Sequence, residues 1–217
     1  MTSEQMLRTQ YSQGRMSLIS KILVVILPLI TVLSFAAGPT SASNPELSER
    51  VFGKADAPVT VIEYASLTCD HCKRFHIEIL PRPKEDYVDT GKIKLIYRHF
   101  PFEQVGMMAA VLAECVPRVR FFGLIDMLFR SHDRWAHTQD PKAGLAQIGL
   151  LAGISRSAFE ACLDDDKLTS AIAEEVRRGQ QEHRVNSTPT FIIGDTVMRG
   201  VRSYDDIARA IDKAAGR

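Results

Sequence analysis

The sequence has almost no excess of charge of either sign. Its 27 lysines and arginines are offset by 26 aspartates and glutamates, so the formal net charge is +1. Proteins that bind nucleic acid usually carry a basic patch or stripe, and this balance gives no support for such a partner. Internal repeats and low-complexity segments are absent as well. We therefore expect one globular domain, or one domain with a large insertion, and no nucleic-acid partner.

Long apolar runs are scarce, and the longest one, near the N-terminus, is too short for a typical membrane-spanning helix. Residues 22–37, ILVVILPLITVLSFAA, contain no charge, follow a basic flank and precede small residues. A spanning helix needs about 20 apolar residues, whereas a basic flank, a shorter apolar run and small residues form a secretory signal. We predict a signal peptide over residues 1–43 and a periplasmic location. The alternative is an uncleaved anchor that holds the same domain outside the membrane.

Cysteine is also rare. The four cysteines, Cys69, Cys72, Cys115 and Cys162, all follow the predicted signal. Export to an oxidising compartment permits disulfides, and an even number of cysteines permits two of them. The two-residue gap between Cys69 and Cys72 favours pairing of these two.

The periodicity of apolar residues predicts an α/β protein. Residues 58–66 and 92–100 resemble strands. The segment between them is helical to about residue 87, where Pro81 and Pro83 should kink or interrupt it.

The second half of the chain adds helices and a hairpin. Residues 103–185 contain helical patterns and no convincing strand. Strands over 190–193 and 196–199 then flank a Gly194-Asp195 turn, and a last helix begins at Ser203. A β-α-β unit followed by a β-β-α unit is the layout of a thioredoxin fold. The prediction is a thioredoxin fold over residues 44–217 with an all-helical subdomain inserted at about 103–187.

The segment Cys69-Asp70-His71-Cys72 lies where the first strand gives way to a helix. Two cysteines three residues apart lie on one helical face and can form a disulfide. The helix N-terminus favours a negative charge, so we expect the pKa of Cys69 to fall and the thiolate to react. His71 can add a positive charge or a hydrogen-bond donor.

Zinc binding is the alternative for two cysteines at this spacing. A zinc site needs four ligands, and Cys115 and Cys162 have no partner nearby in the sequence. We expect no metal or cofactor.

Thr188-Pro189 precedes a strand near the end of the chain. Proline cannot donate a hydrogen bond to a sheet, and one solution is a cis peptide bond at a close approach. A cis bond would leave the backbone groups of Thr188 free to pair with an extended substrate beside the cysteines. A trans proline in an edge strand is the alternative.

The stretch APVTVIEYASLTCDHCKRFH, with STPTFIIG near the end, closely resembles the DsbA-like family, especially its alphaproteobacterial members. The resemblance covers about residues 51–215. It implies a periplasmic enzyme in which Cys69 is the exposed attacking thiol and Cys72 its buried partner. It also implies that Asp70 and His71 tune the redox potential and that Pro189 is the cis proline.

The resemblance bears on three further residues. In related proteins a buried acid at the place of Glu63 helps to move protons from the inner cysteine, whereas a strand glutamate can equally face solvent. Cys115 and Cys162 look like the second disulfide of some members of this subgroup, and two buried free thiols are the alternative. Among the remaining residues, we expect Trp135, His99, Phe121 and Phe122 in the core and His132 and His137 at the surface.

The leading functional hypothesis is an oxidase that passes a Cys69–Cys72 disulfide to reduced exported polypeptides. The resemblance implies that a membrane partner of the DsbB type then reoxidises it. A disulfide isomerase or reductase is the alternative, but those usually need an N-terminal dimerising or trimerising segment. Only about eight residues, 44–51, precede the domain here, which favours a monomer. An antigen-like protein without activity is disfavoured by the intact cysteines and Thr188-Pro189.

Overall fold

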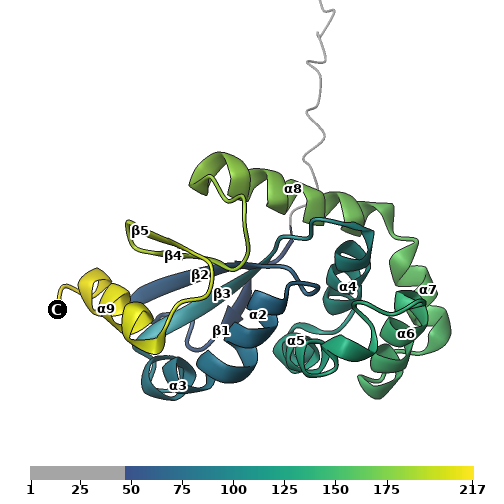
Figure 1. Ribbon diagram of the computed structural model, residues 1–217, viewed down its shortest axis with the longest axis horizontal. Helices are drawn as coiled ribbons and strands as arrows, with labels where there is room; N and C mark the ends of the chain where they lie inside the picture. The colour runs from purple at the N-terminus through teal and green to yellow at the C-terminus, as the bar shows by residue number, and fades with distance from the viewer. Residues whose placement is uncertain (1–46) are drawn as a thin grey trace, which may run out of the picture. The chain divides into compact units, whose positions relative to one another are not determined.

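The computed structural model describes residues 47–217, so the predicted signal peptide over residues 1–43 lies outside the described residues. Within that range, no helix combines the length and the apolar character needed to cross a membrane. A five-stranded sheet forms the centre, with the strand order β1-β3-β2-β4-β5 (Figure 1). The strands are β1 (Arg50–Phe52), β2 (Val59–Ala65), β3 (Ile93–His99), β4 (Thr190–Ile193) and β5 (Thr196–Arg199).

The predicted thioredoxin arrangement is confirmed. The parallel strands β2 and β3 pair from Val59 opposite Ile93 to Ala65 opposite His99. The hairpin β4–β5 adds antiparallel to β2. Strand β1, which pairs antiparallel with β3, was not predicted from the sequence. With three residues, β1 is too short to show the alternation that identifies a strand.

Alternate residues of β2 face two different layers, as expected for a strand. Val59 and Val61 pack with apolar residues of the helical stretch after Cys69 and of α9 (Tyr204–Ala214). Tyr64 faces the opposite layer, where it packs near α8 (Asp166–His183). A Cβ atom on Gly179 of α8 would lie 2.6 Å from the Tyr64 ring. The close approach of α8 to the sheet therefore requires glycine at this position.

The helical stretch after Cys69 does not break at its two prolines. It runs through α2 (Asp70–Arg74), η2 (Phe75–Ile79), α3 (Pro81–Pro83) and η3 (Lys84–Val88). In η2 and η3 the backbone widens to π-helical hydrogen bonds, such as the one from the Leu80 N–H to the Phe75 carbonyl. Proline lacks an N–H and its ring crowds the preceding turn, so the stretch changes its hydrogen-bond pattern instead of ending.

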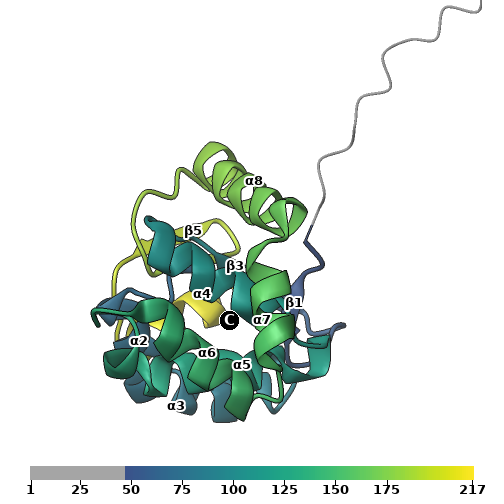
Figure 2. The ribbon, with the colours of Figure 1, turned by 90° about the vertical axis from the view of Figure 1, so that its right-hand side faces the viewer.

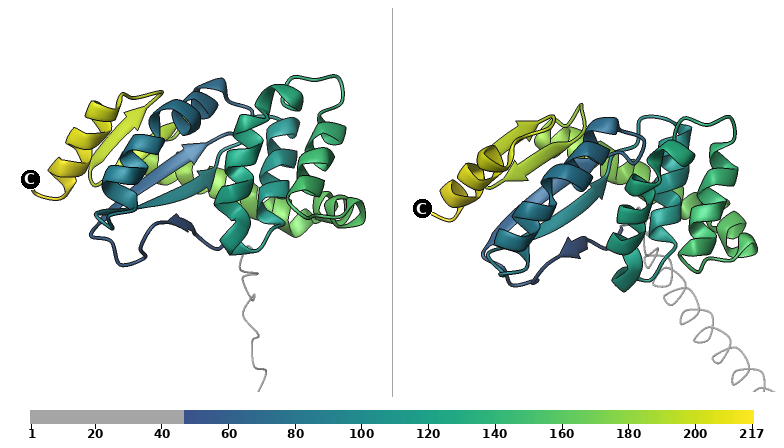
Figure 3. Two further views of the ribbon diagram at one scale, coloured as in Figure 1. Left: turned by 90° about the horizontal axis from the view of Figure 1, so that it is seen from below. Right: turned by 60° about the horizontal axis from the view of Figure 1, so that its bottom comes forward.

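Four of the inserted helices gather at one end of the sheet, and the fifth, α8, extends from there across one face of it (Figures 2 and 3). The four are α4 (Gln104–Glu114), α5 (Phe121–Arg130), α6 (Pro141–Leu151) and α7 (Arg156–Leu163), with short 3-10 turns η4 (Arg118–Arg120) and η5 (His132–Arg134). Their core contains Phe121, Phe129 and Trp135, all fully buried. The side chains of Ser155 and Asp165 cap α7 and α8.

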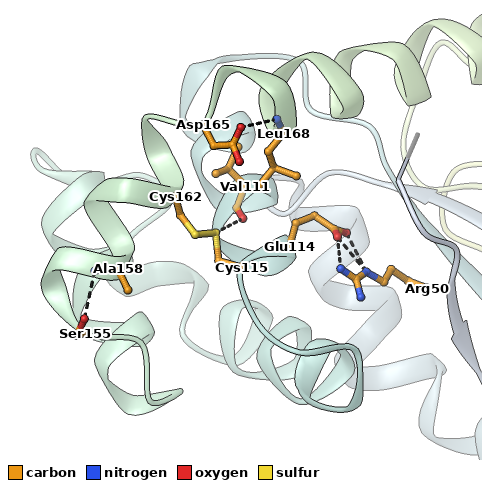
Figure 4. Close-up of a disulfide and its surroundings, with 9 residues drawn as sticks. All are labelled: Arg50, Val111, Glu114, Cys115, Ser155, Ala158, Cys162, Asp165 and Leu168. Carbon is orange, nitrogen blue, oxygen red and sulfur yellow. Dashed lines mark hydrogen bonds and ion pairs between the residues drawn. A yellow bond between two sulfur atoms is a disulfide. The ribbon is translucent and has the colours of Figure 1, made fainter. Parts of the chain in front are cut away.

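An ion-pair network and a disulfide hold α4 in place (Figure 4). Arg50 of β1 and His99 of β3 both bond to the Glu114 carboxylate of α4. Burial alone would raise the pKa of Glu114, but the hydrogen bonds from His99 and Arg50 outweigh burial and lower this pKa. The next residue, Cys115, forms a disulfide with Cys162 of α7, with 6.2 Å between the two Cα atoms.

Candidate active site

The reactive sulfur lies at the junction that the sequence predicted. β2 ends at Ala65, and Cys69 is the N-cap residue of α2. Its Sγ atom accepts a hydrogen bond from the Cys72 backbone N–H at 3.4 Å. Cys69 is half-buried, whereas the side chain of Cys72 is fully buried. The helix thus presents one sulfur to incoming molecules and covers the other.

The surroundings of Cys69 favour its thiolate. The largest contribution is the hydrogen bond from the Cys72 thiol, which outweighs partial burial; Thr188 and the backbone N–H groups of Cys72 and His71 add to it. Together they lower the pKa of Cys69 to about 5. A thiol with such a pKa is almost fully ionised at neutral pH and is the reactive species of disulfide exchange.

Cys72 is shifted in the opposite direction. Burial raises its pKa well above the usual value, and the neighbouring Cys69 and the carboxylate of Glu63 raise it further. The two cysteines are therefore electrostatically unequal. Cys69 is suited to attack or to leave, and Cys72 is suited to hold a proton until a disulfide forms.

The Thr188–Pro189 bond is cis, the geometry that the sequence analysis favoured over a trans proline. It brings the Thr188 carbonyl to 3.5 Å from Cys69 Sγ, and the thiol donates a hydrogen bond to it. These residues are 119 positions apart in the sequence. The contact follows from the pairing of β4 with β2, which places the start of β4 beside the end of β2.

Glu63 points into the interior beneath the cysteines. Its side chain has no exposed surface, and both carboxylate oxygens lie 3.0–3.1 Å from Nε2 of His76. His76 stands four residues after Cys72, one helical turn further along the same face, and stacks on Phe129 at 4.4 Å. From the sequence, Glu63 could equally face solvent or the interior, and no role beside it was predicted for His76. The spacing of Cys72 and His76 was the signal that could have found the pair.

A loop and the inserted helices form the rim of the site. The Thr68 hydroxyl donates to Oε1 of Glu103 at 2.6 Å, and the same oxygen accepts the Gly106 N–H at the start of α4. Beside them lies a hollow of about 230 Å³ lined by Thr68, Glu103, Val105, Ala136 and His137. The carboxylate of Glu103 therefore ties the loop before Cys69 to the insertion and borders a space that can take a side chain.

The two residues between the cysteines are both exposed. The backbone N–H of His71 contributes to the thiolate environment of Cys69. Asp70 lies near His132 and His137, and the ligand atoms of these three residues lie within 4.8 Å of one another. The prediction that His132 lies at the surface is wrong, because its side chain is fully buried against Trp135.

Comparisons with known proteins agree with this geometry. A family model described as thioredoxin matches residues 46–213. The crystal structure of Wolbachia pipientis alpha-DsbA1 superposes with a TM-score of 0.72 at 31% identity, over 79% of this chain and 93% of that one. BdbD from Bacillus subtilis, in its oxidised form, superposes with a TM-score of 0.71 at 25% identity, over 78% of this chain and 94% of that one.

Curated sequences lead to the same group. A Rickettsia bellii protein provisionally named a protein-disulfide oxidoreductase is 31% identical over 168 residues, which are 77% of this chain and 64% of the relative. The chain thus spans less than two thirds of the length of that relative. The region that the family model matches contains the cysteine pair, the Thr188-Pro189 segment and the inserted helices. This chain therefore belongs to the thioredoxin family and, within it, to the DsbA-like proteins.

Proposed function

We propose that this protein is a periplasmic thiol–disulfide oxidase that introduces disulfides into exported polypeptides. The observation that carries the proposal is the inequality of the two sulfurs, with the pKa of Cys69 lowered to about 5 and that of Cys72 raised. A stabilised thiolate favours the reduced enzyme over its disulfide, which makes the disulfide a stronger oxidant. The names of the relatives support the same class of chemistry.

The reaction begins with the Cys69–Cys72 disulfide. A substrate thiolate attacks the sulfur of Cys69; a bond between substrate and Cys69 forms, and Cys72 leaves and takes up a proton. A second substrate thiolate then attacks the substrate sulfur, which forms the substrate disulfide and releases Cys69 as a thiolate. Two electrons pass to the enzyme, and the low pKa of Cys69 makes it a good leaving group in this last step.

Several groups around the sulfurs assist this sequence. The cis Thr188–Pro189 segment offers the main chain of Thr188 beside Cys69, where an extended substrate can pair with it. We assign to the buried Glu63–His76 pair the task of accepting and releasing the proton of the Cys72 thiol, because the Glu63 carboxylate acts on the pKa of that thiol. Asp70 and His71 are assigned to tuning the potential. A membrane protein of the DsbB type is proposed as the reoxidising partner, and the enzyme is proposed to act as a monomer.

The first test is the ionisation of Cys69. In the reduced protein, alkylation by iodoacetamide should follow a titration with a midpoint at pH about 5, because the thiolate is the species that reacts. Cys69→Ser should abolish the fast reaction, whereas Cys72 should stay unreactive in the folded protein. A midpoint near that of an unperturbed thiol, at about pH 8.5, would rule out the proposed chemistry.

The second test separates an oxidase from an isomerase or reductase. The oxidised protein should restore activity to reduced, unfolded ribonuclease, and its potential against glutathione should lie well above the thioredoxin value of about −270 mV. Replacing His71 with serine should lower the potential. Rescue of scrambled ribonuclease without oxidation of the reduced substrate, or a potential as low as that of thioredoxin, would favour the alternative activities.

A further inference from the structure

A cluster of one carboxylate and two imidazoles lies beside the redox pair. Asp70 comes from the first turn of α2, and His132 and His137 come from the segment after α5. The His132 Nδ1 atom lies 3.6 Å from Oδ1 of Asp70, and the His137 Nε2 atom lies 4.0 Å from Oδ2 of the same residue. The two imidazole rings lie 5.2 Å apart at an angle of 75°. Three potential ligands therefore converge from two segments about sixty residues apart in the sequence.

His132 needs a partner that the protein does not provide. Its side chain is fully buried, and neither ring nitrogen has a hydrogen-bond partner. Buried polar atoms are nearly always hydrogen-bonded, and leaving one without a partner destabilises the folded protein. Its Nδ1 atom points between Asp70 and Asp133, at 3.6 Å from an oxygen of each, which is too long for a hydrogen bond. Such an arrangement leaves space for an ion between the nitrogen and the carboxylates.

We propose that Asp70, His132 and His137 bind a divalent transition-metal ion of the zinc type. Imidazole nitrogen and carboxylate oxygen bind zinc at about 2.0–2.2 Å, which places tetrahedral ligands roughly 3.3 Å apart. The present separations are 3.6 Å from His132 to one oxygen of Asp70 and 4.0 Å from His137 to the other, and one ligand atom from each residue lies within 4.8 Å of the other two. Rotation of the exposed Asp70 and His137 side chains can shorten these separations to the distances that zinc needs. Two imidazoles favour zinc, copper or nickel over magnesium or calcium.

The fourth coordination position remains open to solvent. Asp133 is close to His132, but its carboxylate is held by the Lys73 ammonium at 2.6 Å. Asp70 and His137 have side chains that are 73% and 61% exposed, which provides an entry path for the ion. Three protein ligands and a water molecule form the arrangement typical of accessible zinc sites.

The test uses the protein with the Cys69–Cys72 disulfide formed, so that neither sulfur can bind zinc. Calorimetric titration with zinc sulfate should show one ion per chain. Asp70→Asn and His137→Gln should each weaken binding at least tenfold, and both positions are exposed enough to leave the fold intact. His183→Gln serves as the matched control, because His183 lies on α8 outside the cluster, near Glu182, and should bind as the wild type does.

Nuclear magnetic resonance identifies the ligands without mutation. In long-range ¹⁵N–¹H spectra, zinc should shift the ring nitrogens of His132 and His137 and leave those of His183 unchanged. The proposal would be overturned by absence of binding, by zinc affinity in both variants equal to that of the wild type, or by unshifted ring nitrogens of His132. His132 would then be a buried histidine beside two carboxylates. Alkylation and refolding assays run without metal test the oxidase role separately, so the two proposals can fail independently.

Discussion

At the scale of single residues, the site depends on main-chain groups as well as on side chains. The Cys69 sulfur accepts the Cys72 N–H, and the pKa of Cys69 is also lowered by the backbone N–H of His71. The imidazole of His71 is exposed, so its effect on the potential stays a prediction. A substitution of His71 keeps the backbone N–H of this residue. The part of the Cys69 pKa shift that comes from this N–H should therefore persist in the variant.

Thr188 provides a side-chain contribution that can be isolated. Thr188→Val keeps the shape of the side chain but removes the hydroxyl that helps to lower the pKa of Cys69. We expect this pKa to rise, with about a fivefold loss in the thiolate equilibrium if the hydrogen bond contributes about 1 kcal/mol. The midpoint of alkylation against pH measures it.

Thr196→Val is the control, because Thr196 starts β5 on the far side of β4 from the cysteines. In the Thr196→Val variant, the midpoint of Cys69 alkylation against pH should equal that of the wild type. If Thr188→Val also leaves it there, the hydroxyl of Thr188 has no part in stabilising the thiolate.

At the scale of secondary structure, local signals in the sequence were sufficient to predict most of the helices and strands. Cys69 and Cys72 were placed correctly because a β-branched run ends just before them and a helical pattern follows. The hairpin over residues 190–199 followed from the Gly194-Asp195 turn. What the sequence could not give depends on tertiary packing. The pairing of Glu63 with His76, the burial of His132 and the short strand β1 all require knowledge of which elements meet.

The capping residue of α9 offers a test at this scale. The Ser203 hydroxyl accepts the Asp206 N–H, and the Asp206 carboxylate accepts the Ser203 N–H, which completes a capping box. Ser203→Ala should lower the free energy of unfolding by about 1 kcal/mol, because the first turn of α9 loses this partner. Urea denaturation measures the change.

Ser170→Ala is a suitable control, since Ser170 is exposed within α8 and alanine favours a helix. It should be neutral or slightly stabilising. Equal stability of the Ser203→Ala protein and the wild type would mean that the cap contributes nothing to α9.

At the scale of the whole molecule, the Cys115–Cys162 disulfide connects the first inserted helix to a later one across 47 residues. The loop-closure estimate for such a separation is about 4 kcal/mol of stabilisation. Replacing both cysteines with serine should therefore lower the free energy of unfolding by up to about 4 kcal/mol. Urea denaturation of the oxidised protein, with Cys69–Cys72 intact in both samples, measures the difference.

The fast alkylation of Cys69 serves as the internal control for that double variant. The disulfide joins the residue after α4 to α7, and neither of its cysteines is among the groups that lower the pKa of Cys69, so the midpoint should stay at about pH 5. A variant as stable as the wild type would show that the inserted helices hold together without this bond.

The short strand β1 has a consequence for anyone who shortens the chain. Arg50 supplies the guanidinium beside Glu114, whose side chain is only 3% exposed. Trimming the amino end past this strand would leave a carboxylate inside the protein with His99 as its remaining side-chain hydrogen-bond partner, and buried charges that lose their counterion are strongly destabilising. A recombinant fragment designed to begin at the obvious central strand would lose the counterion of a helix more than sixty residues away.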